Sequence, residues 1–477
     1  MSPLFRKSVL ALFALTFLVA APLVILLTAG YRYSWKKNRF EKTGMIYVET
    51  EPRSVRVYLN GVQQKKTTPT SLTHLLPDDY RVRLEKTGYL NWEKTMTVES
   101  GATSFAKVAR LFPNTPPKPL RTENGTIVMA DINGQTGQAA VLVSTPDWWE
   151  LKIFSPAESD SLPLARFPVG NLTEAALTWS PDSRHLLLKM MATDGPRAFV
   201  YAADDPGRAV AIHELAAAAE KNLAIKELDA SWNNDGSLLA VRTKRSAYVL
   251  RPDNGPLERL PFTGILNDVR LGSDAAYVLT TIPAGLKDAT ADRTSIADDN
   301  PVETVALVAV RLTDGRNLPM AELPAGAYRL IDVSDRFISV GNRLTGQLLL
   351  IDPNDGQTVV KTAAGRLRWE NGPGRGRLLL WNDFEINVFD PSDRSLELVT
   401  RLGTTVGDCR WLPGGQHILV STPETVTVYE LEDRNGRQST ELFRFSSVAS
   451  FDVNPAGTQL YFVGAAGRQR GLYARGL

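Results

Sequence analysis

Cysteine and histidine are almost absent from the 477-residue chain, which has one cysteine, Cys409, and four histidines. One thiol makes neither an internal disulfide nor a CxxC redox pair, and four scattered histidines do not make a His-rich metal centre. Cys409 stands between Asp408 and Arg410 with no histidine nearby in the sequence, so we interpret it as a buried strand residue. The composition points away from most metalloenzymes.

Common catalytic patterns are also missing, because the chain has no HExxH, GxSxG or Walker A sequence. The glycine-rich stretch 372–376 joins two expected strands and precedes no helix, which indicates a hairpin turn. The acidic turns at 204–205 and 352–356 lack the spacing of an EF-hand and are ordinary turn chemistry. We predict no catalytic residue, no cofactor and no metal site, and the sequence leaves the partner-binding residues unknown.

Charge of one sign does not dominate. The chain has 54 basic and 52 acidic residues, a net charge of +2, and 43% hydrophobic residues. This is ordinary globular composition, and it lacks the basic bias of a nucleic-acid binder. We therefore predict no nucleic-acid partner.

A long uncharged run, 8–31, occupies the N-terminus. At 1.5 Å per residue it spans about 30 Å, the thickness of a bilayer core, and a membrane helix tolerates Pro22 as a kink. A cleaved signal peptide normally has a shorter apolar region followed by a small-x-small cleavage motif, and a buried soluble helix is a third reading. We predict an uncleaved single-pass anchor within 1–31.

Basic residues flank this run on both sides: Arg6 and Lys7 precede it, and Arg32, Lys36, Lys37, Arg39 and Lys42 follow it in the juxtamembrane basic segment 32–43. Counting positive charges places the large C-terminal part in the cytoplasm. The order of anchor, small domain and repeats instead favours the extracytoplasmic side. We expect the latter orientation, with a scaffold on the cytoplasmic side as an alternative.

Residues 44–112 read as short strands separated by turns. Tyr80 to Leu84 alternates apolar and basic residues, and Asn60-Gly61 is a strong two-residue hairpin signal. About seventy residues of this kind predict a small antiparallel β-sandwich. We expect four aromatic side chains in its core: Tyr58, Tyr80, Tyr89 and Trp92.

The ordered segments 51–61, 68–69, 76–80 and 86–89 resemble the PEGA domain, a small β-sandwich of bacterial and archaeal surface proteins. Two turns depart from that pattern: Pro-Arg-Ser-Val begins at Pro52 where the family has Pro-Glu-Gly-Ala, and Pro77-Asp78 stands where Pro-Gly is usual. The resemblance implies a spacer or binding module at the cell envelope, and it implies no catalysis. A proline-rich linker, 113–120, follows and predicts a domain boundary.

A unit of strand, polar turn and strand recurs through 121–477. The clear copies are 177–188, 230–240, 368–380, 410–420 and 451–462, and weaker copies centre on 271–274 and 333–335. Most are followed by a second hairpin, and four short strands per unit are typical of a propeller blade. Eight units are favoured and seven is the alternative. The last unit has about three strands, so a strand near the linker is expected to complete it and close the ring.

The turn Trp-Ser-Pro-Asp at 179–182 resembles the TolB-like and WD40-like propeller repeats. Tryptophan recurs at this repeat position, and we interpret these side chains as packing between blades: Trp179, Trp232, Trp369 and Trp411. We also expect a short inserted helix at 214–220 and a long polar loop at 282–302.

Together these features predict an all-β protein with an N-terminal transmembrane helix, a PEGA-like β-sandwich and a 7–8-bladed β-propeller. We interpret it as a membrane-anchored, non-catalytic cell-envelope scaffold that binds a protein or cell-wall polymer through its propeller. The alternative is a propeller hydrolase or lyase acting on envelope polysaccharide. A central cluster of Arg, Tyr and Glu would favour the enzyme, and a plain polar channel would favour the scaffold.

Overall fold

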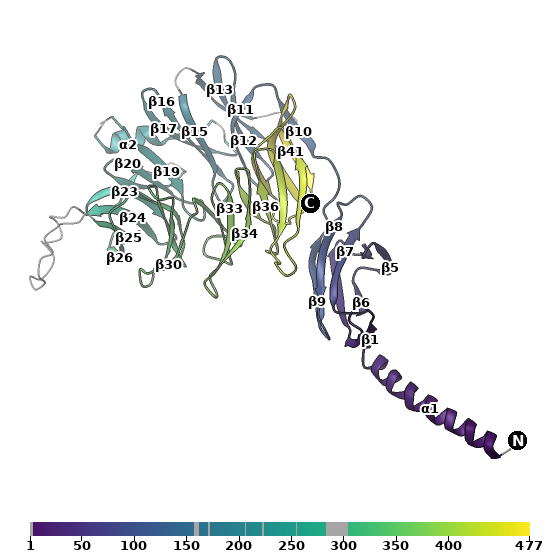
Figure 1. Cartoon of the computed structure of the whole chain (residues 1–477). Helices are drawn as coiled ribbons and strands as arrows, with labels where there is room; N and C mark the ends of the chain where they lie inside the picture. The colour runs from purple at the N-terminus through teal and green to yellow at the C-terminus, as the bar shows by residue number, and fades with distance from the viewer. Residues whose placement is uncertain are drawn as a thin grey trace, which may run out of the picture. The chain divides into compact units, whose positions relative to one another are not determined.

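The computed structural model describes residues 3–156, 162–169, 172–205, 207–221, 224–253, 255–282 and 304–477. The chain divides into two compact units. The first contains Met1–Pro116 and Val428–Leu442, and the second contains Pro117–Thr427 and Phe443–Leu477. Strands are the predominant secondary structure of both units, which confirms the predicted all-β fold (Figure 1).

The N-terminal helix α1 (Pro3–Thr28) confirms the expected apolar helix and continues through Pro22. Its segment Ser8–Thr28 is long and apolar enough to cross a membrane, and no part of its most apolar window is buried. By length and composition this helix is a candidate membrane anchor or signal sequence.

The basic segment after α1 is a β-hairpin of β1 (Tyr31–Ser34) and β2 (Arg39–Lys42), which the sequence analysis did not predict. Gly30 has a φ of +85°, and this left-handed conformation lets the chain turn out of the helix. The hydroxyl and backbone N–H of Thr43 both donate to the Gly30 carbonyl, each at 2.8 Å, and so close the base of the hairpin.

The next segment confirms the predicted small β-sandwich. One sheet has the order β6 (Thr70–Leu75), β3 (Gly44–Glu51), β9 (Thr103–Arg110), and the other β5 (Val62–Thr67), β4 (Arg56–Leu59), β7 (Asp78–Glu85), β8 (Trp92–Val98). The expectation of a purely antiparallel sandwich was wrong, because β3 and β9 pair in parallel. The second sheet lies between them in sequence, so the chain re-enters the first sheet in its original direction.

The sandwich core consists of aliphatic and aromatic side chains from both sheets, with Trp92 inside it and Tyr80 and Tyr89 packed against it. Tyr58 is outside this core, contrary to expectation, and its ring lies 4.6 Å below the guanidinium of Arg83. The predicted Asn60-Gly61 turn is present, and both residues have positive φ.

Residues from Lys118 to Gly476 form eight four-stranded sheets (Figure 1). Sheet 1 is β11 (Thr126–Ile132), β12 (Ala139–Ser144), β13 (Trp148–Phe154) and β14 (Leu162–Pro168); sheet 2 is β15 (Leu172–Trp179), β16 (His185–Ala192), β17 (Gly195–Ala202) and β18 (Ala209–Ala211). Sheet 3 is β19 (Leu228–Trp232), β20 (Leu239–Thr243), β21 (Ala247–Leu250) and β22 (Glu258–Arg259); sheet 4 is β23 (Ile265–Leu271), β24 (Ala275–Ile282), β25 (Thr304–Arg311) and β26 (Asn317–Leu323).

The remaining sheets repeat this pattern. Sheet 5 is β27 (Tyr328–Val333), β28 (Ile338–Asn342), β29 (Leu348–Ile351) and β30 (Thr358–Thr362); sheet 6 is β31 (Arg366–Trp369), β32 (Leu378–Trp381), β33 (Glu385–Asp390) and β34 (Ser395–Arg401). Sheet 7 is β35 (Cys409–Trp411), β36 (His417–Ser421), β37 (Thr425–Glu430) and β38 (Ser439–Arg444); sheet 8 is β39 (Ser447–Val453), β40 (Gln459–Ala466), β41 (Gln469–Gly476) and β10 (Lys118–Glu123). Because β11 contacts both β15 and β39, the first strand of each sheet is the inner strand of a closed ring.

The ring is closed by β10, which pairs antiparallel with β41 and supplies the fourth strand of sheet 8. This strand begins at Lys118, inside the segment expected to be linker, and Pro119 lies on it. An outer edge strand tolerates proline because its free edge needs no N–H donor. The expected inserted helix is present as α2 (Ile212–Ala219), whereas the expected polar loop at 282–302 lies almost wholly outside the described residues.

Candidate functional site

The inner strands of the propeller place one residue of each sheet at the same position. In each sheet this residue is the second-to-last of the inner strand. Its partner on the second strand belongs to the next-to-last residue pair of the register. These residues, which we call the inner ring, are Asp131, Thr178, Ser231, Arg270, Asp332, Arg368, Arg410 and Asp452. The inner ring therefore combines carboxylates, guanidinium groups and two hydroxyls, and it contains neither Tyr nor Glu.

The recurring tryptophans end four of these inner strands and connect neighbouring sheets. Each indole N–H donates to the inner strand of the preceding sheet: Trp179 to the Asp131 carbonyl (3.1 Å), Trp232 to the Thr178 carbonyl (3.3 Å), Trp369 to Asp332 Oδ2 (2.9 Å) and Trp411 to the Arg368 carbonyl (3.0 Å). This agrees with the interpretation that these side chains pack between blades, and it adds a polar contact to that packing.

Charged side chains on and beside the inner strands of sheets 6, 7 and 8 pair with one another between neighbouring sheets. Arg410 lies 3.0 Å from Asp408 and 3.1 Å from Asp452, and its side chain is only 9% exposed. Arg368 lies 3.6 Å from Asp408 on the other side. Burial raises the pKa of Asp408 and Asp452, and the nearby Arg368 opposes this shift. The charges of this region are thus largely neutralised within the propeller itself.

Asp131 is an inner-ring carboxylate whose pKa is displaced upward. Burial raises its pKa to about 6, although the backbone N–H of Trp179 donates to its carboxylate at 2.8 Å and lowers the pKa. The neighbouring carboxylate of Asp452 adds to the increase. Asp131 therefore gains or loses its charge close to neutral pH.

A cavity of about 660 Å³ opens between sheets 2 and 3, among turns that follow the inner strands. We call the end of the propeller that carries these turns the cavity end. The walls of this first cavity carry more acidic than basic side chains: Asp182, Asp204, Asp205 and Asp253 against Arg184 and Arg208. His185 Nε2 lies 3.2 Å from Asp253 Oδ1, and Arg208 donates to the Asp253 carbonyl at 3.1 Å.

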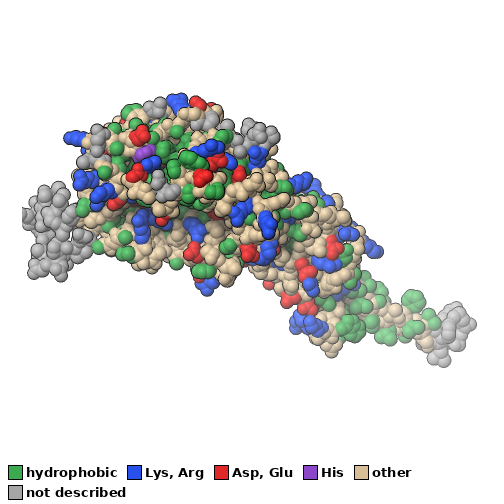
Figure 2. Space-filling model, turned by 90° about the horizontal axis from the view of Figure 1, so that it is seen from above, with side chains coloured by type: hydrophobic (Ala, Val, Ile, Leu, Met, Phe, Trp, Pro, Cys, Tyr) green, Lys and Arg blue, Asp and Glu red, His purple; other side chains and the backbone are tan. Residues whose placement is uncertain are grey.

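A second cavity, of about 420 Å³, lies between sheets 5 and 6 at the same end. Here the basic side chains are in the majority, with Arg336, Arg375 and Arg394 against Asp335 and Asp352. The cavity end therefore presents two separate clefts of opposite charge bias. Figure 2 shows basic and acidic side chains interspersed over the face of the molecule that it presents.

The residues considered from sequence fall mostly into structural roles. Cys409 is buried, and both this burial and the adjacent Asp408 raise the pKa of its thiol. The backbone N–H of Asn354 donates a hydrogen bond to Asp352 Oδ1, so the Asp352 carboxylate stabilises its own 352–356 turn. The stretch 372–376 connects β31 and β32 with three glycines at positive φ, as a turn requires. Among the described residues, no three His, Cys, Asp or Glu side chains are grouped so as to hold a metal ion.

Sequence reasoning missed the inner ring and the cavity end. A signal for the inner ring was present, because Arg368 and Arg410 directly precede the repeat tryptophans. Asp408 pairs with Arg368 of the preceding repeat as well as with Arg410 of its own, and Asp452 of the following repeat pairs with Arg410, so these ion pairs could not be predicted from the sequence. Of the acidic turns, only 204–205 pointed to residues that line the first cavity.

Comparison with known proteins identifies the segment after α1. Residues 43–109 match the PEGA domain. The match covers the two sheets of the sandwich and confirms the resemblance drawn from its turns and strands. Comparison with curated protein sequences finds no match.

Solved structures similar to this chain are propellers. The C-terminal WD40 domain of Sif2 is 14% identical and covers 75% of this chain and 98% of its own, with a TM-score of 0.46. The Dos1 propeller is also 14% identical and covers 75% of this chain and 94% of its own, with a TM-score of 0.48. The propeller assignment itself rests on the eight four-stranded sheets and their closure by β10.

Proposed function

We propose that the protein is a membrane-anchored, non-catalytic interaction scaffold of the cell envelope, with its PEGA domain and propeller on the extracytoplasmic side. A PEGA domain together with a propeller favours a protein-interaction role. In this proposal α1 holds the chain in the membrane, and the propeller binds an envelope protein or a cell-wall polymer at its cavity end.

The pair of oppositely biased clefts at the cavity end is the observation that carries this proposal. A polymer of one charge sign would match only one cleft, whereas a folded protein surface presents acidic and basic groups together. The acid-rich first cavity and the arginine-rich second cavity therefore favour a protein partner with both kinds of group. This argument narrows the choice between protein and polymer that the sequence left open.

The inner ring supports the scaffold over the alternative of a polysaccharide hydrolase or lyase. An enzyme of that kind needs acids, bases or cations that are free to act on the substrate. Arg410 instead lies within 3.1 Å of two carboxylates, and no Tyr or Glu occupies an inner-ring position. These charged side chains of the propeller form ion pairs with one another.

The binding role is tested with a photo-crosslinking amino acid in the full-length protein in native membranes. We place it at Asp205, in the first cavity, and as a control at Leu344, an exposed residue in a turn at the opposite end. Protein adducts from position 205 that are absent from position 344 are expected. Equal adducts at both positions, or none at 205, would contradict the proposed binding end, and turnover of an envelope polysaccharide would favour the enzyme.

The orientation is tested by protease treatment of intact cells, after any outer membrane has been opened, with detection of the C-terminal unit. Cleavage of the propeller while a cytoplasmic protein stays intact is expected. Protection in intact cells with cleavage after lysis would overturn the envelope location and support the cytoplasmic-side alternative.

A further inference from the structure

The hairpin that follows α1 has its apolar face turned outward. Tyr33 and Phe40 are paired across the two strands and share one face. The other face carries Ser34 and Glu41, which are buried at 4% and 8% exposure, and Arg32 and Arg39, which are exposed. Phe40 is 41% exposed and Trp35, in the turn, is 87% exposed. Contact of the Trp35 and Phe40 rings with water is unfavourable, so an apolar environment outside the protein would explain their exposure.

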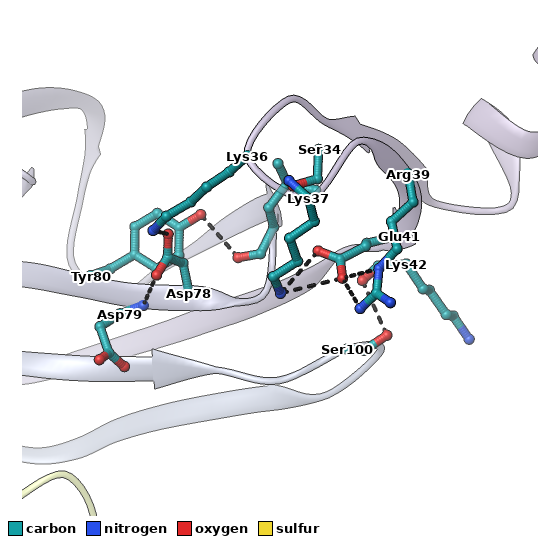
Figure 3. A network of polar contacts seen from close by, with 11 residues as sticks. Ser34, Lys36, Lys37, Arg39, Glu41, Lys42, Asp78, Asp79, Tyr80 and Ser100 are labelled. Atoms are coloured by element: carbon teal, nitrogen blue, oxygen red, sulfur yellow. Dashed lines mark hydrogen bonds and ion pairs between the residues drawn. The ribbon is translucent and has the colours of Figure 1, made fainter.

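The basic residues of the hairpin are organised around its buried side. Lys37 and Arg39 pair with Glu41 at 3.2 and 2.7 Å, and Lys36 reaches Asp78 of the PEGA domain at 3.1 Å (Figure 3). These contacts hold the turn with Trp35 at its tip. The segment still carries an excess of positive charge, because Glu41 is its one acidic residue beside five basic ones.

The aromatic cluster follows the apolar helix closely in sequence. The ring of Tyr33 packs edge-on against Trp35 and Phe40, with centroids 4.9 and 5.3 Å apart. The apolar stretch Ser8–Thr28 has 21 residues, about 30 Å of helix, so a bilayer that encloses it has its surface near Thr28. Tyr31 begins the hairpin just beyond, where Trp and Tyr are enriched in membrane proteins and where Lys and Arg meet lipid phosphates.

We propose that the β1–β2 hairpin binds the surface of the bilayer that carries α1, with Trp35 and Phe40 inserted at headgroup level and the net positive charge of the segment favouring anionic phospholipids. The inference rests on the proposed membrane anchoring by α1. It adds a second, peripheral attachment that limits how the PEGA domain moves against the membrane.

The test uses the full-length protein in nanodiscs that contain spin-labelled lipid, with and without an anionic phospholipid. An environment-sensitive fluorophore is attached at Trp35→Cys and, as a control of similar exposure in the propeller, at Leu344→Cys, which is 77% exposed. The only native cysteine, Cys409, is buried and does not compete for the label. We expect at least twofold stronger quenching at position 35 than at position 344, and stronger quenching when anionic lipid is present.

Quenching at position 35 no stronger than at position 344 would overturn the proposal. Equal quenching in the two lipid mixtures would overturn its electrostatic part. Resistance to alkaline extraction from membranes is measured separately and reports on α1 alone. A protein that resists extraction without quenching at position 35 retains its anchor and loses only this inference, whereas one that is extracted contradicts the anchoring.

Discussion

Two groups of ion pairs in this molecule each join a basic side chain to aspartate, in different surroundings. At the juxtamembrane hairpin, Lys36 and Asp78 pair with side chains that are 77% and 50% exposed. At the inner ring, Arg410 pairs with Asp408 and Asp452 while only 9% of its side chain is exposed. Exposed pairs contribute about 0–1 kcal/mol, whereas removing one partner of an enclosed pair costs about 3–5 kcal/mol. The surroundings of a charge, more than its partner, decide what the pair does for the fold.

Removal of Arg410 is the strongest test of this comparison. Arg410→Ala removes the guanidinium closest to both Asp408 and Asp452 and leaves Arg368, 3.6 Å from Asp408, as the remaining nearby cation. We expect a loss of about 3 kcal/mol in the free energy of unfolding, the lower end of the range for an enclosed pair. Urea denaturation of the full-length protein measures it. Arg251→Ala removes an exposed partner of Glu258 in the same unit and is expected to cost below about 1 kcal/mol. Equal losses in the two variants would refute the comparison.

The raised pKa of Asp131 predicts a pH dependence of folding stability, which tests how strongly the inner ring is enclosed. Because its pKa is raised to about 6 in the folded protein, the native state binds this proton more tightly than the unfolded chain, and stability falls as pH rises from about 4 to about 6. Asp131→Asn removes that loss and keeps an acceptor for the Trp179 N–H. We expect the variant to be more stable than the wild type by about 1–3 kcal/mol at pH 7–8, and equal to it below about pH 4. Parallel stability profiles across pH 4–8 would contradict the raised pKa.

Two of the repeat tryptophans allow a carboxylate and a backbone carbonyl to be compared as hydrogen-bond acceptors. Trp369→Phe removes the indole donor from the carboxylate of Asp332, whose pKa burial already raises, and we expect a loss of about 2 kcal/mol. Trp411→Phe removes the same donor from a backbone carbonyl, that of Arg368, and is expected to cost about 1 kcal/mol. Thermal unfolding of both variants compares them, and a larger loss for the second would reverse the argument.

The exposed pair gives the smallest effect. Lys36→Gln breaks the contact with Asp78, and we expect a change in unfolding free energy that is close to the error of measurement and vanishes in high salt. Unfolding in detergent, at low and high salt, separates the effect of this ion pair from any lipid contact. A salt-independent loss as large as that of Arg410→Ala would contradict the comparison.

Much of the architecture was readable from local patterns. The uncharged N-terminal run, the Asn60-Gly61 turn and the recurring tryptophans each reflect the neighbours of a residue along the chain, and each was found as predicted. The strand that closes the ring was also anticipated, because the last repeat was one strand short. Repetition amplified a signal that was weak in any single copy.

The candidate sites were less readable, since they depend on residues from different repeats. Arg410 contacts one aspartate two residues away and another 42 residues further along the chain, and the second contact forms only when two neighbouring sheets pack together. Within the first unit, Trp92 Nε1 donates to the carboxylate of Glu430, 338 residues later in sequence. The exposure of Trp35 and Phe40 was not predicted, because the sequence of 32–43 does not show which side of the hairpin packs against the rest of the first unit.

The sequence by itself determined the apolar helix, the PEGA domain and the propeller repeat, because spacing, turn chemistry and hydrophobic alternation act between near neighbours. The tertiary structure decided which charges are enclosed, which pair with one another and which aromatic side chains stay exposed. Those properties depend on dielectric surroundings and on distances across the closed ring of sheets, and both arise only when the chain is folded.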